Sequence, residues 1–188
     1  MAPETLKSTT MPLTPLHRAL SFALHAHAGV DREGPDPLPY FTHPIEVLNN
    51  LRYTGGVIDE DLLCAAVLHD VIEESAIHLA EIEAQFGIRV CGLVKELTRR
   101  EPGPAETSGL DKPQIWALRS EILLAEIAKM SRDAQAVKLA DRLSNLREAK
   151  RTKRHEKLKR YIGQTRRILE TVPESVNPGL WNAIKREL

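Results

Sequence analysis

Apolar residues recur at intervals of three and four along almost the whole chain, which is the spacing of one face of an α-helix. Capping residues and prolines mark helix starts, as at Thr14 and Pro15, and glycines mark ends, as at Gly55 and Gly56. The pattern predicts helices over residues 15 to about 29, 44–54, 59 to beyond 68, 78–98, 118–130, 134–147 and 153–169, with a short one after 178. No segment of useful length has the period of a strand. The predicted fold is therefore all-α, a bundle of about eight helices.

Proline and glycine interrupt this pattern in two places. Residues 30–42 and 99–113 are predicted loops, and a break is expected within the fourth helix at Gly87 or Gly92. The chain has 188 residues, of which 42% are hydrophobic, enough to bury one sizeable core. We therefore expect a single domain over residues 1–188, with residues 1–14 a candidate for disorder.

The composition is typical of a soluble globular protein. No apolar run approaches the ~20 residues that a membrane span needs, and residues 1–15 lack the basic-then-apolar order of a secretory signal. We expect a cytoplasmic protein. Cys64 and Cys91 each lie in an apolar helical pattern without metal-type spacing, so we expect buried thiols and no disulfide.

Charge is balanced overall and uneven locally. The 26 Lys and Arg match the 26 Asp and Glu, which argues against a nucleic-acid polymer as partner. Residues 147–167, however, contain ten Lys or Arg and two Glu, a net charge of +8. A solvated helix face and a clamp for an anionic ligand explain this stretch equally well.

The pair His69 and Asp70 follows four apolar residues on a helix that is predicted to be buried. An unpaired charge there would be costly, and a metal ion is one partner that satisfies both groups together. Glu73 is four residues after His69 and three after Asp70, so on a continuous helix it shares their face. That is where a base that activates water would stand.

Asp141 has similarly apolar neighbours, and Asn145 lies one turn further on. His43 directly precedes Pro44, where a loop can present its imidazole to a neighbouring helix. Two imidazoles and two carboxylates suit Mn²⁺, Fe²⁺, Co²⁺ or Zn²⁺, and an octahedral ion would keep about two positions open for water and substrate. A lone buried histidine is more often a hydrogen-bonded core residue, but the set together predicts a metal-dependent phosphohydrolase. The predicted ligands are His43, His69, Asp70 and Asp141.

Five blocks of sequence occur in a characteristic order and span most of the chain. They are His27-Ala28-Gly29 with Arg32, then Pro39-Tyr40-Phe41-Thr42-His43-Pro44, Ala65 to Glu74, Phe86-Gly87 with Leu93-Val94 and Leu97-Thr98, and Lys138 to Leu146. In these blocks the chain resembles the HD-domain hydrolases, and more closely the hydrolase domain of RelA/SpoT-type proteins and the stand-alone small alarmone hydrolases.

The resemblance implies an activity and a set of roles. It implies removal of the 3′-pyrophosphate from (p)ppGpp to give GDP or GTP and pyrophosphate. It implies Mn²⁺ bound by the four predicted ligands, and Glu73 and Glu74 as the pair that prepares the attacking water. The positions that match substrate contacts are Arg32, Asn145, Lys157 and Tyr161.

The chain also departs from the family pattern. Val30 and Glu33 stand where Gln and Lys are usual, Glu74 replaces the commoner Asp, and Ser144 replaces a frequent His or Tyr. These departures leave the base open, so an adenosine alarmone, a deoxynucleotide or the 2′-phosphate of NADPH is an alternative substrate. A non-catalytic nucleotide-binding module is a further alternative, against which the intact ligands and the glutamate pair argue.

Other histidines and the tryptophans receive structural interpretations. We expect His27 to brace the first loop by hydrogen bonding. Trp116 and Trp181 occupy amphipathic helix positions and are predicted to belong to the core rather than to stack on a base.

Overall fold

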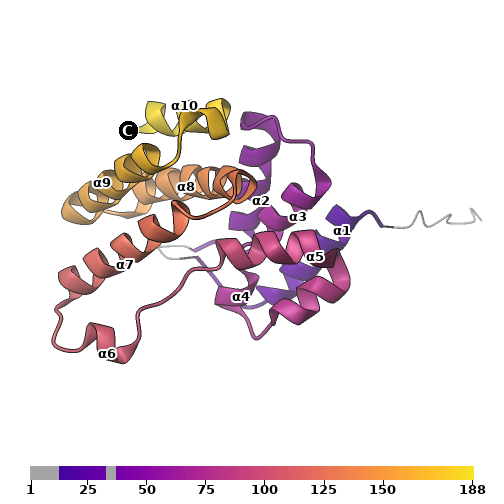
Figure 1. Ribbon diagram of the computed structural model, residues 1–188, viewed down its shortest axis with the longest axis horizontal. Coiled ribbons are helices and arrows are strands. Elements are labelled where there is room, and N and C mark those ends of the chain that lie inside the picture. Colours follow the sequence, from indigo (N-terminus) through magenta and orange to yellow (C-terminus); the bar gives the residue numbers. More distant parts are fainter. Residues whose placement is uncertain (1–12, 33–36) are drawn as a thin grey trace, which may run out of the picture.

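The computed structural model describes residues 13–32 and 37–188, and these form a helical bundle (Figure 1). The longer helices are α1 (Pro15–Ala26), α2 (Thr42–Asn49), α3 (Glu60–Leu68), α5 (Leu79–Leu97), α7 (Lys112–Ile127), α8 (Arg132–Thr152), α9 (His155–Thr171) and α10 (Pro178–Glu187). The short ones are α4 (Val71–Glu74), α6 (Pro104–Thr107), the π-helical turn η1 (Asn50–Thr54) and the 3₁₀ turn η2 (Glu174–Val176). The predicted all-α fold of about eight helices is confirmed, since eight helices in the described ranges have eight residues or more.

The parts of the chain outside the helices form little regular structure. Among the described residues the only strand-like pairing is an isolated antiparallel bridge between Asp31 and Pro39. None of the described helices is long and apolar enough to cross a membrane. Residues 1–12, most of the segment for which disorder was considered, and Glu33 lie outside the described residues.

Capping side chains set several helix starts as the sequence predicts. The Thr14 side chain accepts a hydrogen bond from the His17 amide at the start of α1, and Asp59 accepts from two amides of α3. The predicted start of α7 near residue 118 is wrong, because α7 begins six residues earlier. Asp111 caps the helix by accepting from the Gln114 amide at 2.8 Å. The predicted loop 99–113 therefore contains α6 and ends in the first turn of α7, where the proline at position 113 needs no amide hydrogen.

The chain does not run as one helix through the His69–Asp70 pair. α3 ends at Leu68, Asp70 has φ −102° and ψ −3°, and the next helical turn is the separate α4. The expectation that Glu73 shares a continuous helix face with the pair is therefore wrong. The turn instead lets His69 and Asp70 face the same point from the end of α3, and α4, whose Glu73 and Glu74 amides donate to the Asp70 carbonyl, sets the direction of Glu73.

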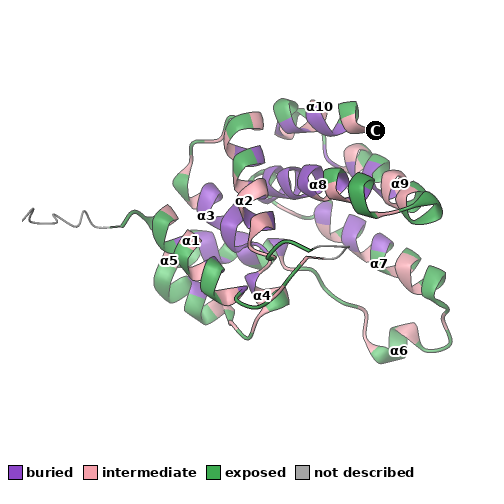
Figure 2. Cartoon of the chain, turned by 180° about the vertical axis from the view of Figure 1, so that it is seen from behind, coloured by how far each residue is buried: buried purple, intermediate pink, exposed green. Residues whose placement is uncertain are grey.

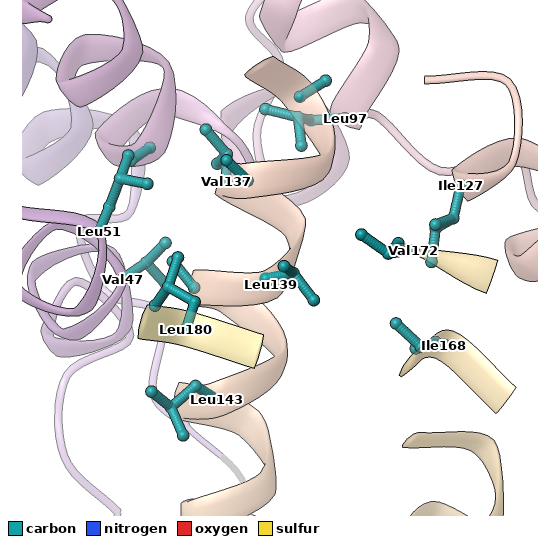
Figure 3. Close-up of a cluster of buried hydrophobic side chains, with 14 of the residues drawn as sticks. Val47, Leu51, Leu97, Ile127, Val137, Leu139, Leu143, Ile168, Val172 and Leu180 are labelled. Carbon is teal, nitrogen blue, oxygen red and sulfur yellow. The ribbon is translucent and has the colours of Figure 1, made fainter. Parts of the chain in front are cut away.

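α8 runs through the middle of the bundle, with α9 and α10 on one side and α2 and α3 on the other (Figures 1 and 2). Residues 134–144 of α8 are all buried, polar side chains included. Leu139 and Leu143 of α8 lie among side chains from several neighbouring elements, including Val47 and Leu180 (Figure 3). A helix buried on all sides in this way can hold charged groups inside the molecule only where they have partners.

Apolar side chains form a second cluster around α1, α3 and α5. It includes Ala23, Val67 and Leu68, and the two halves of α5 contribute Ile82 and Val90. α5 bends between these halves at Gly87, which has φ 83° and ψ 168°. The predicted break is confirmed at Gly87, and Gly92 continues the helix. Cys64 and Cys91 are both buried and free, as expected.

Candidate metal centre and its cleft

Four side chains from three places in the chain converge at one point. His43 lies in the first turn of α2, His69 and Asp70 lie between α3 and α4, and Asp141 lies in the middle of α8. His43 Nε2 lies 3.3 Å from Asp141 Oδ1 and 3.5 Å from Asp70 Oδ2. His69 Nε2 lies 3.1 Å from Asp70 Oδ2 and 3.8 Å from Asp141 Oδ1. The ligand atoms of His43, His69 and Asp141 all lie within 4.8 Å of one another, a spacing that could hold a metal ion.

In both histidines the Nδ1 atom already has a hydrogen-bond partner. His69 Nδ1 lies 2.8 Å from the carbonyl oxygen of Ala66, which can only accept, so Nδ1 carries the hydrogen. His69 Nε2 is buried and has no hydrogen-bond partner among the described residues, although two carboxylate oxygens lie near it. In the neutral imidazole, lone pairs of nitrogen and oxygen therefore face one another across a small space. A divalent cation fits this set of donors because it can accept the buried lone pair of His69 Nε2 and the neighbouring carboxylate oxygens together.

The electrostatics of His69, Asp70 and Asp141 agree with such a site. Burial lowers the pKa of the His69 imidazole, but Asp70 and Asp141 outweigh burial and raise it to about 9. Burial raises the pKa of Asp70, whereas His69 lowers it, and the net effect is a lowered pKa, so the carboxylate stays charged. Burial raises the pKa of Asp141, whereas Lys138 and the two imidazoles lower it. The net effect is a pKa well below that of an ordinary aspartate. Two buried carboxylates therefore stay charged beside the imidazoles and attract positive charge to this point.

Neighbouring side chains fix the two aspartates. The Tyr40 hydroxyl donates to Asp70 Oδ2 at 2.6 Å, and Lys138 Nζ lies 2.9 Å from Asp141 Oδ2. The Asn145 amide donates to Asp141 Oδ1 from one turn along α8. Burial and Asp70 raise the pKa of Tyr40, which keeps its hydroxyl a hydrogen-bond donor. Asp141 is thus held through both oxygens by its own helix.

Glu73 stands beside this cluster and is held by the segment that follows α5. The Arg99 amide donates to Glu73 Oε1 at 2.7 Å, and the Arg99 guanidinium lies 3.3 Å from Oε2. The side chain of Glu73 is 16% exposed. Burial raises the pKa of Glu73, and Arg99 opposes this rise. A carboxylate with a raised pKa is a better proton acceptor than a free glutamate at neutral pH.

A cleft of about 450 Å³ opens above the cluster. Its walls combine the carboxylates with cations from α8, α7 and the loop after α5, and with aromatic rings. Its lining includes Tyr40, His43, Asp70, Glu73, Glu74, Arg99, Trp116, Arg119, Lys138, Asp141, Arg142, Asn145, Lys153, Tyr161 and Gln164. The guanidinium of Arg142 lies 4.5 Å from the centre of the Tyr161 ring, and Glu101 pairs with both Arg99 and Arg119. Such a wall can neutralise a phosphorylated ligand next to the metal site.

A second cavity of about 420 Å³ adjoins the first and shares several lining residues with it, including Arg99 and Lys153. Arg32 lines this second cavity, where it pairs with Glu46 and Glu148. The two spaces together form one elongated site, with the candidate metal ligands at one end and Arg32 at the other.

The structure brings most of the predicted site residues together. Glu74 is exposed and lines both cavities. Asn145 and Tyr161 also line both cavities. Lys157 is exposed and is absent from the described lining of either cavity, whereas Lys153 lines both. Within the basic stretch 147–167, Lys153, which lies just before α9, is therefore the lysine that reaches the site.

Two other expectations need correction. His27 is buried, but neither of its ring nitrogens has a hydrogen-bond partner among the described residues, and its ring packs 4.8 Å from that of Tyr40. It therefore braces the loop by packing rather than by hydrogen bonding. Trp116 is only partly buried and lines the cleft beneath Arg160, while Trp181 packs against the core as predicted.

Tyr40, Lys138, Arg99 and Ser144 were not singled out as site residues from the sequence. Lys138 had a readable signal, because a lysine three residues before a buried aspartate on an apolar helix faces it. Arg99 had none, since only the path of the chain after α5 brings it to Glu73.

Comparison with known proteins now decides the family, because residues 19–169 match the sequence pattern of the HD domain. The chain belongs to the HD-domain family. Among its HD-domain relatives is the guanosine-3′,5′-bis(diphosphate) 3′-pyrophosphohydrolase MESH1 of Drosophila melanogaster, 34% identical over 74% of this chain and 72% of that protein. The Homo sapiens protein of the same name is 35% identical over 72% of this chain and 70% of its own length. The predicted resemblance is confirmed.

Two solved structures are similar to this chain in fold. One, described as a metazoan orthologue of SpoT that hydrolyses ppGpp, has a TM-score of 0.79 with 28% identity, covering 95% of this chain and 96% of that one. A protein from Listeria monocytogenes has a TM-score of 0.60 with 24% identity, covering 79% of this chain and 94% of its own, and shares the fold.

Proposed function

We propose that this chain hydrolyses the 3′-pyrophosphate of a guanosine alarmone, converting (p)ppGpp to GDP or GTP and pyrophosphate, with Mn²⁺ as its cofactor. The relatives that carry this activity in their names cover nearly three quarters of the chain. The observation that carries the proposal is the cluster of imidazole and carboxylate groups at the floor of a cleft that is also lined by five Lys or Arg side chains.

The residues of the cluster would hold the cation through His43, His69, Asp70 and Asp141. When bound, the cation supplies Lewis-acid activation of a phosphoryl oxygen and of water. Glu73 accepts the proton of the attacking water, and its position beside the aspartates and its raised pKa suit that role. Glu74 lies next to Glu73 at the cleft wall and would support the groups that bind the cation. The bond between phosphorus and the ribose 3′-oxygen breaks as the water oxygen bonds to phosphorus, and the leaving oxygen takes up a proton to become the 3′-hydroxyl of GDP or GTP.

The substrate would lie along the elongated site. Lys138, Arg142 and Arg99 line the cleft near the metal centre and neutralise the pyrophosphate. Asn145 and Tyr161 line both cavities, and Arg32 stands at the far end, where the nucleoside would lie. Lys157, one turn before Tyr161 on α9, would meet the substrate only at the rim, because its side chain is exposed.

The test is product analysis with Mn²⁺-loaded protein. The protein is incubated with ppGpp, pppGpp, an adenosine 3′-pyrophosphate, NADPH and deoxynucleotides, and the products are separated and identified. We expect GDP or GTP and pyrophosphate in equal amounts from the guanosine compounds. Release of pyrophosphate from none of the 3′-pyrophosphorylated compounds contradicts the proposal, and release of phosphate from NADPH alone would move the function to a different phosphate ester.

A further inference from the structure

A line of polar side chains leads from the metal centre to the far end of the site. His43 Nδ1 lies 3.1 Å from Ser144 Oγ, and this hydroxyl lies 2.6 Å from Glu46 Oε2. Arg32 Nη1 donates to the same carboxylate oxygen at 3.4 Å, and the Nη2 of Arg32 donates to Glu148. The line therefore joins α2, α8 and the segment after α1.

The hydrogen atoms along this line have one consistent arrangement. A carboxylate has no hydrogen to give, so Ser144 donates its only one to Glu46, and the serine oxygen then accepts the Nδ1–H of His43. In the neutral imidazole, His43 Nε2 is then without a hydrogen. This is the nitrogen that faces Asp70 and Asp141, so its lone pair is presented where a cation would lie.

We propose that Ser144 and Glu46 are positioning residues for the metal centre, and that Arg32 in turn holds the Glu46 carboxylate in place. The inference deepens the proposed function, since it rests on the same site binding a divalent cation. Ser144 orients the ligand His43, and Glu46 with Arg32 couples this ligand to the second cavity.

Burial gives this arrangement its force. Ser144 is 1% exposed and His43 is 3% exposed, so water cannot readily replace the serine hydroxyl. A serine inside a helix commonly donates to the carbonyl four residues earlier, but Ser144 donates across to α2 instead. Without the hydroxyl, the Nδ1–H of His43 would be buried and unpaired, and the other tautomer or a turned ring would become favourable. Partners of this kind behind metal-binding histidines typically contribute about 10- to 100-fold to metal affinity.

Arg32 extends the effect to the second cavity. The Glu46 side chain is 42% exposed and could turn toward solvent, whereas the Arg32 side chain is 9% exposed and is held at its other end by Glu148. Arg32 therefore fixes Glu46 from a buried position while it also lines the second cavity. A ligand that draws Arg32 away from Glu46 would therefore weaken cation binding, and by reciprocity a bound cation would weaken the binding of that ligand.

The experiment measures Mn²⁺ affinity directly, without substrate, by competition with a metal-sensitive fluorescent chelator. We expect Ser144→Ala to weaken Mn²⁺ binding about tenfold or more, and Glu46→Gln and Arg32→Ala to weaken it by smaller factors in that order. Ser144→Thr keeps the hydroxyl and should restore affinity toward that of the unsubstituted protein. Ser120→Ala is the matched control, because Ser120 is a buried serine that accepts a hydrogen bond from Gln164 and lies outside the lining of the metal cleft.

Thermal melts of each variant show that it is folded before its affinity is compared. Unchanged Mn²⁺ affinity in folded Ser144→Ala, or an equal loss in Ser120→Ala, would overturn the proposal. If Ser144→Ala does not fold, Glu46→Gln, at a partly exposed position, decides in its place, and unchanged affinity there overturns the proposal in the same way. If affinity falls as expected while the parent protein releases no pyrophosphate from ppGpp, the positioning role stands and the proposed function fails.

Discussion

At the scale of single residues, Asp70 and Glu73 have separate roles in the site. Asp70 lies among the lone pairs of the metal centre, whereas Glu73 is held beside them by Arg99. We expect Asp70→Ala to abolish Mn²⁺ binding, because it removes an oxygen that faces both imidazoles. We expect Glu73→Gln to retain Mn²⁺ and to lower kcat about 10²- to 10⁴-fold, the usual contribution of a general base. Metal titration and steady-state kinetics on both variants check this, and unchanged turnover in Glu73→Gln removes Glu73 from its role.

Arg99 should set the pH at which Glu73 works. Burial raises the pKa of Glu73, while the Arg99 amide and guanidinium lower it. A base must be deprotonated, so kcat/KM falls as the pH drops through this pKa. Removing the guanidinium in Arg99→Ala disfavours the charged carboxylate, so the acid limb of the pH profile should move to higher pH. The backbone hydrogen bond remains in this variant, and Arg99→Lys should keep the limb near its original position. An acid limb that moves to lower pH in Arg99→Ala contradicts this assignment.

At the scale of elements, the bend of α5 depends on one glycine. Gly87 has φ 83° and ψ 168°, a region that residues with a Cβ avoid, although a Cβ there would meet no atom within 4 Å. We therefore expect Gly87→Ala to lower the free energy of unfolding by about 1–3 kcal/mol through backbone strain alone. Gly92 lies in the same helix with equally open space and ordinary helical geometry. Gly92→Ala should raise the free energy of unfolding by up to about 1 kcal/mol. Urea denaturation of both variants measures the difference, and equal effects would contradict it.

The sequence predicts elements well where local chemistry decides them. Thr14 and Asp59 cap helices as expected, and Gly87 breaks one, because each acts on its own few residues. The turn after Leu68 could not be predicted, since apolar spacing continues across it and only packing of the ends of α3 and α4 separates them.

For the site, too, the sequence predicts what local chemistry decides and misses what depends on distant segments of the chain. The types and order of the ligands predicted that His43, His69 and Asp141 gather, because buried imidazoles and carboxylates need partners. Arg99 and the pairing of Arg32 with Glu148 depend on segments far apart in the sequence, and no local pattern encodes them. The placement of Lys153 rather than Lys157 in the cleft depends on how the chain passes from α8 to α9, and His155, the first residue of α9, has a positive φ of 39°.

At the scale of the whole molecule, the candidate metal centre joins the two apolar clusters. His69 directly follows Leu68 of the cluster around α1, α3 and α5, while Asp141 lies between Ala140 and Leu143 of the cluster around α8. A cation bound by both would hold the two halves of the core together. Binding to the folded state alone must therefore appear as added stability.

We accordingly expect Mn²⁺ to raise the free energy of unfolding by about 2.7 kcal/mol at one hundred times its dissociation constant, a rise in Tm of about 5–10 °C for a chain of this size. The physical reason is that the ligands of α2, α3 and α8 face one another only in the folded chain. Thermal melts with increasing Mn²⁺, and then with a chelator, measure the effect. Asp141→Asn keeps the shape of the side chain but removes its charge, so its Tm should not respond to Mn²⁺. An equal response in Asp141→Asn would mean that the cation acts at some other surface, because the bridge between the two clusters needs that carboxylate.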